Sequence, residues 1–107
     1  MGSINFKPAE VLAAEKVEAN RMVLKATRDA DLKAITHTLA DGSVVQVRPE
    51  DLANFNMAVI EGLSEDWVMD NNDVRELTVA EMQECILSGI AQGKVIWKTY
   101  TDALKLL

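Results

Sequence analysis

The sequence contains little cysteine and no long apolar run, and both absences narrow the class of protein. Cys85 is its one cysteine, so no internal disulfide can form and the fold cannot depend on oxidising conditions. The longest apolar runs have four residues, at 11–14 and 57–60, whereas a membrane-spanning helix needs about 20. The first residues also lack the basic and apolar regions of a secretory signal. We therefore expect a cytoplasmic protein without a membrane partner.

Basic residues are scarce as well. Eleven Lys and Arg residues face 17 Asp and Glu residues, which leaves a net charge of −6. A protein that binds a phosphate backbone needs a basic surface, which is the opposite balance. Nucleic acid is therefore not an expected partner.

No group of residues has the spacing of an active site. The single histidine, His37, lies between two threonines and far along the chain from Cys85. A metal or nucleophilic site would need further ligands or a partner in the right register. We interpret His37 as a residue on the face of a strand and Cys85 as a buried, inert thiol.

The acidic residues between positions 61 and 84 raise the question of a divalent cation. An EF-hand loop beginning at Asp70 would place Glu81 correctly, but Val74 would stand at a ligand position and Arg75 would replace the required glycine. The segment 89–93 lacks the preceding strand and following lysine of a phosphate-binding loop. We predict no catalytic residue, no cofactor and no metal site, and expect that the protein is not an enzyme.

The composition is that of one folded domain. The chain has 107 residues, of which 49% are hydrophobic and 26% charged, a balance typical of a globular domain. This length is sufficient for one ordinary domain and too short for two. We expect a single domain over residues 1–107, with residues 1–7 as a flexible amino-terminal segment.

The first element expected is a helix over residues 8–28, because Pro8 suits a first helical turn and strong helix formers follow it. An apolar stripe recurs along it at steps of three and four residues. It consists of Leu12, Ala19, Met22, Val23, Ala26 and Ala30. Since small residues bury little area each, this helix needs a partner, either from its own chain or from a neighbour.

Two β-hairpins are expected next. The β-branched segments 34–39 and 44–48 flank Asp41-Gly42, a pair that tolerates the positive φ angles of a tight turn. The short segments 67–70 and 74–77 flank an Asn-Asn-Asp turn, and asparagine often adopts the left-handed conformation. In the second hairpin, Trp67 is interpreted as a ring that covers a small core.

A helix should separate the two hairpins and another should follow them. Pro49 begins the middle helix, which should run to about Glu61 and be capped by Gly62. The residues expected on its buried face are Leu52, Phe55, Met57, Val59, Ile60 and Leu63. The predicted fold class is α+β, in the order helix, β-hairpin, helix, β-hairpin and long C-terminal helix.

The last helix has the sharpest start signal. Thr78 and Glu81 form a capping box, in which the two side chains satisfy each other's backbone N–H groups. Helical spacing continues from there almost to the carboxyl end. Gly89 and Gly93 weaken the middle of this helix, so we expect either a close approach by another helix, a kink, or a division into two helices.

Aromatic residues near the carboxyl end are the candidates for binding another protein. Trp97 and Tyr100 lie on the last helix among several lysines, two turns and one turn before Leu104. Such residues either anchor a core or form the centre of a protein–protein contact. We select Trp97, Tyr100 and Leu104 as protein-binding residues.

The stretch 19–104 resembles the small carboxyl-terminal domain of unknown function of phage tail-fibre assembly (chaperone) proteins and related phage tail proteins. The resembling segments are Ala19-Asn20-Arg21, Val44-Val45-Gln46-Val47-Arg48, the helix through residues 54–60 and, above all, the run from Trp67 through Asn71-Asn72-Asp73 and Leu77-Thr78 to Met82. The chain departs from that pattern at Val44-Val45, where the family often has an aromatic residue and glycine, and at Asn54-Phe55, where it often has Ser-Arg.

The resemblance implies a phage or prophage tail context. It implies a tail-fibre assembly chaperone that binds the receptor-binding tail fibre. Such a protein would act in the host cytoplasm during assembly, and the virion tail is the alternative location. The alternative is a structural tail component without chaperone activity, in which the first and last helices pack against copies of themselves as a homo-oligomer.

Overall fold

The computed structural model describes residues 8–107. The prediction of a flexible segment at residues 1–7 lies outside these residues. The elements follow one another as α1 (Ala9–Lys33), β1 (Thr36–Thr38), β2 (Val44–Gln46), α2 (Pro49–Glu61), β3 (Glu65–Val68), β4 (Val74–Leu77) and α3 (Val79–Lys105). Three helices and two antiparallel hairpins, β1–β2 and β3–β4, confirm the predicted fold class.

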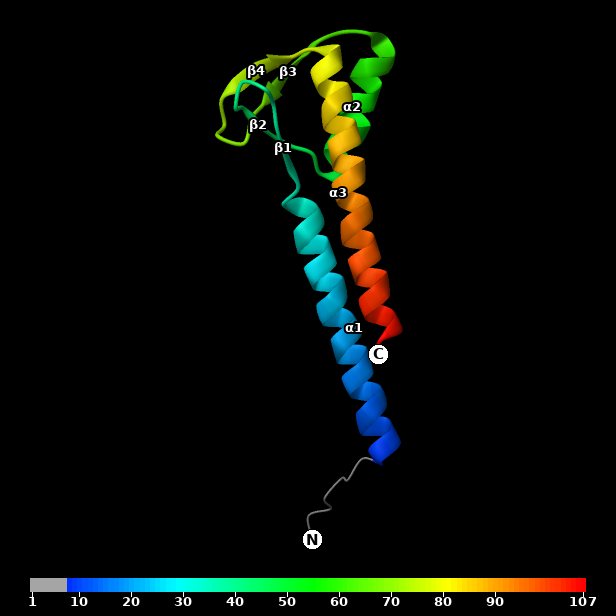
Figure 1. The fold of residues 1–107 in the computed structure, drawn as a ribbon. Helices are drawn as coiled ribbons and strands as arrows, with labels where there is room; N and C mark the ends of the chain where they lie inside the picture. The colour runs from blue at the N-terminus through cyan, green and yellow to red at the C-terminus, as the bar shows by residue number, and fades with distance from the viewer. Residues whose placement is uncertain (1–7) are drawn as a thin grey trace.

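The molecule is elongated, with extents of 72 × 27 × 24 Å. Figure 1 shows α1 and α3 running antiparallel and side by side, so that the start of α1 and the end of α3 lie toward the same end of the molecule. The hairpins and α2 gather around the first half of α3. We call this part, residues 34–92, the head, and call α1 together with residues 93–105 of α3 the stem.

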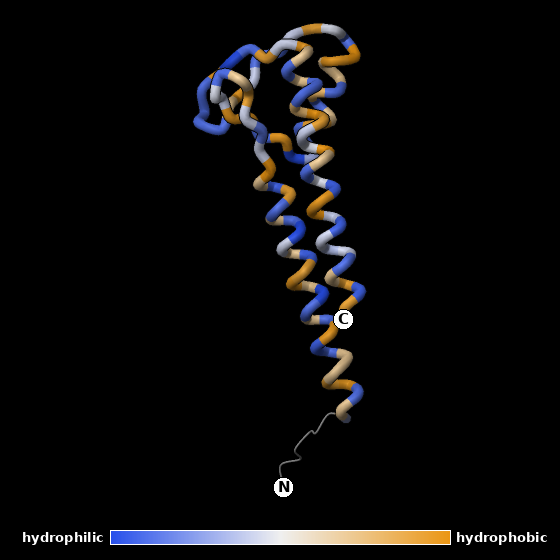
Figure 2. Tube along the Cα trace, in the orientation of Figure 1, coloured by the Kyte–Doolittle hydropathy of each residue, from blue (hydrophilic) through white to orange (hydrophobic). Residues whose placement is uncertain are grey.

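The hydrophobic core lies in the head. Its buried apolar residues are Ile35, Leu39, Val45, Val47, Phe55, Ala58, Met69, Leu77, Met82 and Cys85. Trp67 covers this core as expected, since its ring lies 4.3 Å from that of Phe55, measured between centroids. In contrast, α1 contributes no buried residue, although Figure 2 shows apolar residues recurring along both stem helices.

The local turn and cap signals are confirmed. Among residues 8–107, three have positive φ angles, as the turn and cap signals require. They are Gly42 in the first turn (88°), Gly62 at the end of α2 (71°) and Asn72 in the second turn (69°). At the start of α3, the backbone N–H of Glu81 donates to Oγ1 of Thr78 at 3.1 Å, and the N–H of Thr78 donates to Oε1 of Glu81 at 3.1 Å. These residues adopt the expected geometry because each signal depends on a few neighbours in sequence.

The first helix is longer than predicted. It ends at Lys33 rather than at Arg28, and β1 is shorter at both ends than the expected strand over residues 34–39. Residues 29–33 contain neither glycine nor proline, so nothing stops the helix there. Leu32 also packs against the core of the head, which holds the last turn in place.

The buried face expected for α2 is partly wrong. Met57, Ile60 and Leu63 are exposed, whereas Phe55 and Ala58 are buried. The reason is that α2 packs on α3 along one narrow side and that no element of the described chain covers its other side. The predicted buried face included every large apolar residue of this helix. The surface of α2 that contacts α3 is narrower than that face.

The two glycines of α3 have different environments. The helix is continuous from Val79 to Lys105, so a division into two helices is excluded. At Gly89 it passes close to α2, and a side chain there would collide with Leu52. At Gly93 a Cβ atom would meet nothing within 4 Å. Of the three alternatives, close approach is therefore confirmed for Gly89 alone.

Candidate protein-binding site

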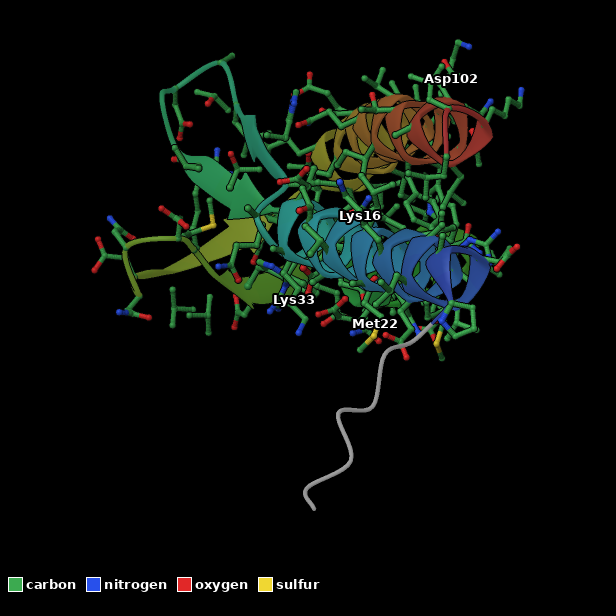
Figure 3. All side chains as sticks on the ribbon, turned by 90° about the horizontal axis from the view of Figure 1, so that it is seen from below. Lys16, Met22, Lys33 and Asp102 are labelled. Carbon is green, nitrogen blue, oxygen red and sulfur yellow. The ribbon has the colours of Figure 1, made fainter. Side chains whose placement is uncertain are left out.

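The apolar stripe predicted on the first helix points away from α3. Met22 and Val23 are 65% and 64% exposed, and Figure 3 shows Met22 on the side of α1 remote from α3. The α1 residues that line its narrow cleft with α3 are Leu24, Thr27, Arg28 and Asp31. The stripe exists as expected, but within the described residues 8–107 it has no partner.

The stem helices are joined through an arginine and two aromatic rings. The guanidinium carbon of Arg28 lies 4.5 Å from the centroid of the Trp97 ring and 4.6 Å from that of Tyr100. The rings themselves meet edge to face, with centroids 5.8 Å apart. Arg28 also donates from Nη2 to Oδ1 of Asp29 at 2.7 Å. Both aromatic residues chosen from the sequence therefore help to hold α1 against α3.

The three predicted binding residues are unequally accessible. Trp97 is 47% exposed, whereas Tyr100 and Leu104 are half-buried beside it on α3. Trp97 can thus contact Arg28 with one face and still offer ring surface to another protein. Tyr100 and Leu104 have less surface to offer, and Tyr100 lines the cleft between α1 and α3.

An open apolar groove lies beside Trp97, at the junction of stem and head. We call it the stem groove; its volume is about 330 Å³. It is formed by the end of α1, the start of α2 and the middle of α3. The lining residues are Leu32, Ile35, Val47, Pro49, Leu52, Gly89, Ile90, Gly93, Lys94 and Trp97. With Lys94 as its one charged lining residue, the groove suits apolar side chains of another polypeptide.

Trp97, which the sequence predicted to bind a protein, lines this groove, but the groove itself and most of its other lining residues were not predicted. Leu32, Pro49 and Leu52 come from different elements, and their approach depends on the tertiary packing. One signal did exist, because Gly89 and Gly93 lie one helical turn apart on α3. Two glycines at this spacing lie on the same face of the helix. At Gly89 the missing side chain allows α2 to pack closely, and at Gly93 a Cβ atom would meet nothing within 4 Å.

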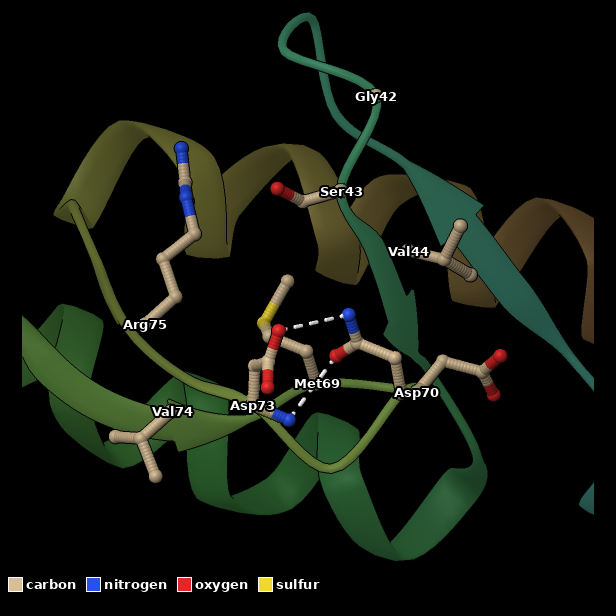
Figure 4. Close-up of a pocket in the computed structure, with 9 residues that line it drawn as sticks. Gly42, Ser43, Val44, Met69, Asp70, Asp73, Val74 and Arg75 are labelled. Carbon is tan, nitrogen blue, oxygen red and sulfur yellow. Dashed lines mark hydrogen bonds between the residues drawn. The ribbon is translucent and has the colours of Figure 1, made fainter.

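A second hollow lies between the two hairpin turns, and its polar groups are largely paired with one another. Figure 4 shows Arg75 and Asp73 at this pocket of about 340 Å³. Arg75 Nη2 lies 3.0 Å from Oδ2 of Asp41 and donates to Oε2 of Glu81 at 2.8 Å. Asn71 Nδ2 donates to Oδ2 of Asp73 at 3.0 Å. We interpret this arrangement as a cross-link that holds the first turn, β4 and α3 together.

The electrostatics around Arg75 agree with that interpretation. The hydrogen bond from Arg75 and then the backbone N–H of Thr78 lower the pKa of Glu81. The pKa of Asp41 is lowered chiefly by its hydrogen bonds with Ser43, with a further contribution from Arg75. Arg75, Glu81 and Asp41 are therefore all charged at neutral pH, as an ion-paired cross-link requires.

His37 and Cys85 have ordinary structural surroundings. Nε2 of His37 lies 2.6 Å from Oε2 of Glu84, which joins β1 to α3. Cys85 is fully buried, and burial is the main cause that raises the pKa of its thiol to about 11. Such a thiol is protonated at neutral pH and is a poor nucleophile.

In residues 8–107, no three His, Cys, Asp or Glu side chains converge in a way that could hold a metal ion. Within the same range, no helix combines the length and the apolar character needed to cross a bilayer.

Comparison with known proteins found no matching family model, no matching curated protein and no matching solved structure. The function must therefore be inferred from the chain's own surfaces and from the resemblance of its motifs.

Proposed function

We propose that this chain is a non-enzymatic, protein-binding module that assists the assembly of a phage tail fibre by binding the fibre protein through the stem groove. The observation that carries the proposal is the open apolar groove beside the half-exposed ring of Trp97. Tryptophan is one of the residues enriched at the energetic centres of protein interfaces, where binding buries its ring in a pocket.

The shape of the groove supports a polypeptide as the ligand. It is open to solvent, is lined by three helices and the segments beside them, and is about 330 Å³ in volume. Apolar grooves between helices accept the apolar face of a helix or an extended segment from a partner. Lys94 is the one charged residue that lines the groove, whereas a chemical reaction on a substrate usually needs several convergent titratable groups.

The fibre enters the proposal through the resemblance of residues 19–104 to the domain found in tail-fibre assembly proteins. An immature fibre exposes apolar surface and strand edges before its chains associate, and such surfaces aggregate. A helper that covers them until the fibre trimerises would need an accessible apolar surface, and the stem groove supplies one. The binding would take place in the host cytoplasm during assembly.

Co-expression with the adjacent fibre gene tests this proposal. We expect more soluble fibre and more fibre trimer when this chain is present. Equal solubility and equal trimer yield with and without it would overturn the chaperone function.

Two variants test the groove itself. Gly93→Leu should fill the groove and weaken fibre binding about tenfold or more, because Gly93 lines the groove and a Cβ atom there meets nothing within 4 Å. Ala91→Leu adds the same side chain at an exposed position of α3 that does not line the groove, and it should bind as the parent chain does. Equal affinity of the two variants would show that the fibre binds elsewhere.

Trp97→Ala provides a second measurement. It should weaken fibre binding by more than about 1 kcal/mol if the ring anchors the contact. Because Trp97 also contacts Arg28, the variant's folding must be checked by circular dichroism before its affinity is interpreted. Unchanged affinity in a folded variant would remove Trp97 from the site.

A structural homo-oligomer in the tail is the second candidate function, and the exposed apolar stripe of α1 favours it. In that case the pure chain would form a stable oligomer in light scattering, and the yield of soluble fibre would not depend on it. The co-expression experiment therefore separates the two functions.

A further inference from the structure

The outer face of α1 is a second apolar surface, separate from the stem groove. It consists of the stripe residues Leu12, Ala19, Met22, Val23, Ala26 and Ala30. None of them lines the groove, and Leu12, Met22 and Val23 are each more than half exposed. The 25 residues of α1 include none that is buried, so the contacts of this helix with α3 leave its outer face uncovered, and helices in proteins depend on the packing of an apolar face.

We propose that a second copy of this chain covers the α1 outer face, so that two α1 helices pack antiparallel in a symmetric dimer. The spacing of the face supports a helical partner. Leu12, Ala19 and Ala26 recur at intervals of seven residues, and so do Val23 and Ala30, whose row has Lys16 at its preceding position. Two apolar rows with this repeat form the seam of a two-helix coiled coil.

The charges of α1 select the antiparallel orientation. Its first half, residues 9–20, has three acidic residues against one basic residue, and its second half, residues 21–33, has four basic residues against two acidic ones. The halves therefore carry net charges of −2 and +2. Antiparallel packing places each negative half beside a positive half, whereas parallel packing would place like charges together. This complementarity identifies a second copy as the occupant.

The sizes of the side chains select the register. When the two-fold axis crosses the helices near Arg21, the midpoint of α1, Leu12 of one copy faces Ala30 of the other. In the same register Val23 faces Ala19 of the other copy. Leu12 and Val23 then each meet an alanine, which permits close packing at these two positions of the seam. Parallel, in-register packing would instead oppose Leu12 to Leu12 and Ala19 to Ala19, and would leave gaps at the alanines.

The expected interface is modest in area. The face from Leu12 to Ala30 is about 27 Å long at 1.5 Å per residue, and a single helical face of this length covers less than the roughly 800 Å² per partner of a standard interface. We therefore expect an equilibrium between monomer and dimer in the micromolar range rather than a permanent dimer.

Sedimentation equilibrium of the pure chain, residues 1–107, over a wide range of concentrations tests the proposal. We expect a monomer–dimer equilibrium, and Val23→Glu should weaken it about tenfold or more. Leu87→Glu is the matched control, because Leu87 is an equally exposed apolar residue on α3, in the head and remote from the α1 outer face. A monomer at every concentration, or an equal effect of the two variants, would overturn the proposal.

Disulfide trapping tests the orientation. Ala19→Cys and Val23→Cys should form few disulfide dimers when oxidised separately, but should link to each other when the two variants are mixed. Parallel packing would give the opposite result, with each variant linking readily to itself, and would overturn the proposed orientation. Gly93→Leu should leave the dimer unchanged, so failure of the fibre-binding proposal and failure of the dimer are distinguishable.

Discussion

A Cβ atom added at Gly89 would lie 2.6 Å from Cδ2 of Leu52 and 3.0 Å from the backbone oxygen of Val47. The start of α2 can therefore lie against α3 only because position 89 has no side chain. This contact fixes one wall of the stem groove, since Gly89, Leu52 and Val47 all line it. The stability of the head and the shape of the candidate binding site thus depend on the same glycine.

The pair of glycines gives the first prediction. Overpacking at Gly89→Ala should cost about 1–3 kcal/mol, which offsets or exceeds the gain of about 1 kcal/mol in helix propensity that alanine brings. Gly93→Ala has that gain without a collision. Urea unfolding should therefore find Gly89→Ala less stable than Gly93→Ala by about 1–3 kcal/mol. Equal free energies of unfolding would contradict the close approach of α2 and α3.

A second prediction concerns the attachment of α1 to α3. Arg28→Gln removes the cation that lies 4.5 Å from the Trp97 ring centroid and 4.6 Å from the Tyr100 ring centroid. We expect the free energy of local opening of α1 to fall by about 1 kcal/mol, the usual size of such a contact. Amide hydrogen exchange along α1 measures this opening.

Arg21→Gln is the control for that experiment. It removes the same charge from the same helix, but Arg21 is exposed and lies 3.8 Å from the carboxylate of Glu18, and exposed pairs of this kind contribute little. If the two variants lowered the protection of α1 equally, the aromatic contact would not be what holds the stem together.

The local elements could be predicted from the sequence, whereas the direction of the apolar faces could not. Thr78, Gly62 and Asn72 were identified correctly because a cap or a turn is determined within a few residues. The stripe on α1 was also identified, but periodicity shows only that a face exists and not which surface covers it. The residues that line the cleft with α3 include Arg28 and Asp31, and neither belongs to the predicted apolar stripe.

The candidate site was predictable to the extent that it depends on residue type. Trp97 and Tyr100 stand out because aromatic rings are rare in this chain, at 5% of residues. Their contact with Arg28 could not be predicted, since it joins helices that are distant in sequence. The same holds for the stem groove, to which Leu32 and Pro49 contribute only after α1 and α2 have packed against α3.

The cross-link around Arg75 gives a prediction about pH. A carboxyl group whose pKa is lowered on folding stabilises the folded state fully above its ordinary pKa, and this contribution is lost as the pH falls through the lowered value. The ordinary value for Glu81 is 4.5. Arg75→Gln should therefore be less stable than the parent chain at neutral pH, and the difference should shrink as the pH falls below about 4.5.

Urea midpoints measured from neutral pH down to the acid range would test this prediction. The variant Arg21→Gln, which loses one positive charge outside the cross-link, corrects for the change in net charge. A difference between Arg75→Gln and the parent chain that stays constant across the acid range would show that Arg75 contributes by packing rather than through Glu81 and Asp41.

The buried thiol gives the last prediction. Burial, with smaller contributions from the charges of Glu84 and Glu81, raises the pKa of Cys85 from 9.0 to about 11. At pH 8 this shift alone lowers the thiolate fraction about a hundredfold, and the thiolate is the reactive form. Iodoacetamide should therefore alkylate Cys85 at least about a hundredfold more slowly in the folded chain than in urea, with glutathione in the same buffers as the control for the reagent. Alkylation of the folded chain at the glutathione rate would contradict the placement of Cys85 in the core, and with it the packing of β1 and α2 against the first half of α3.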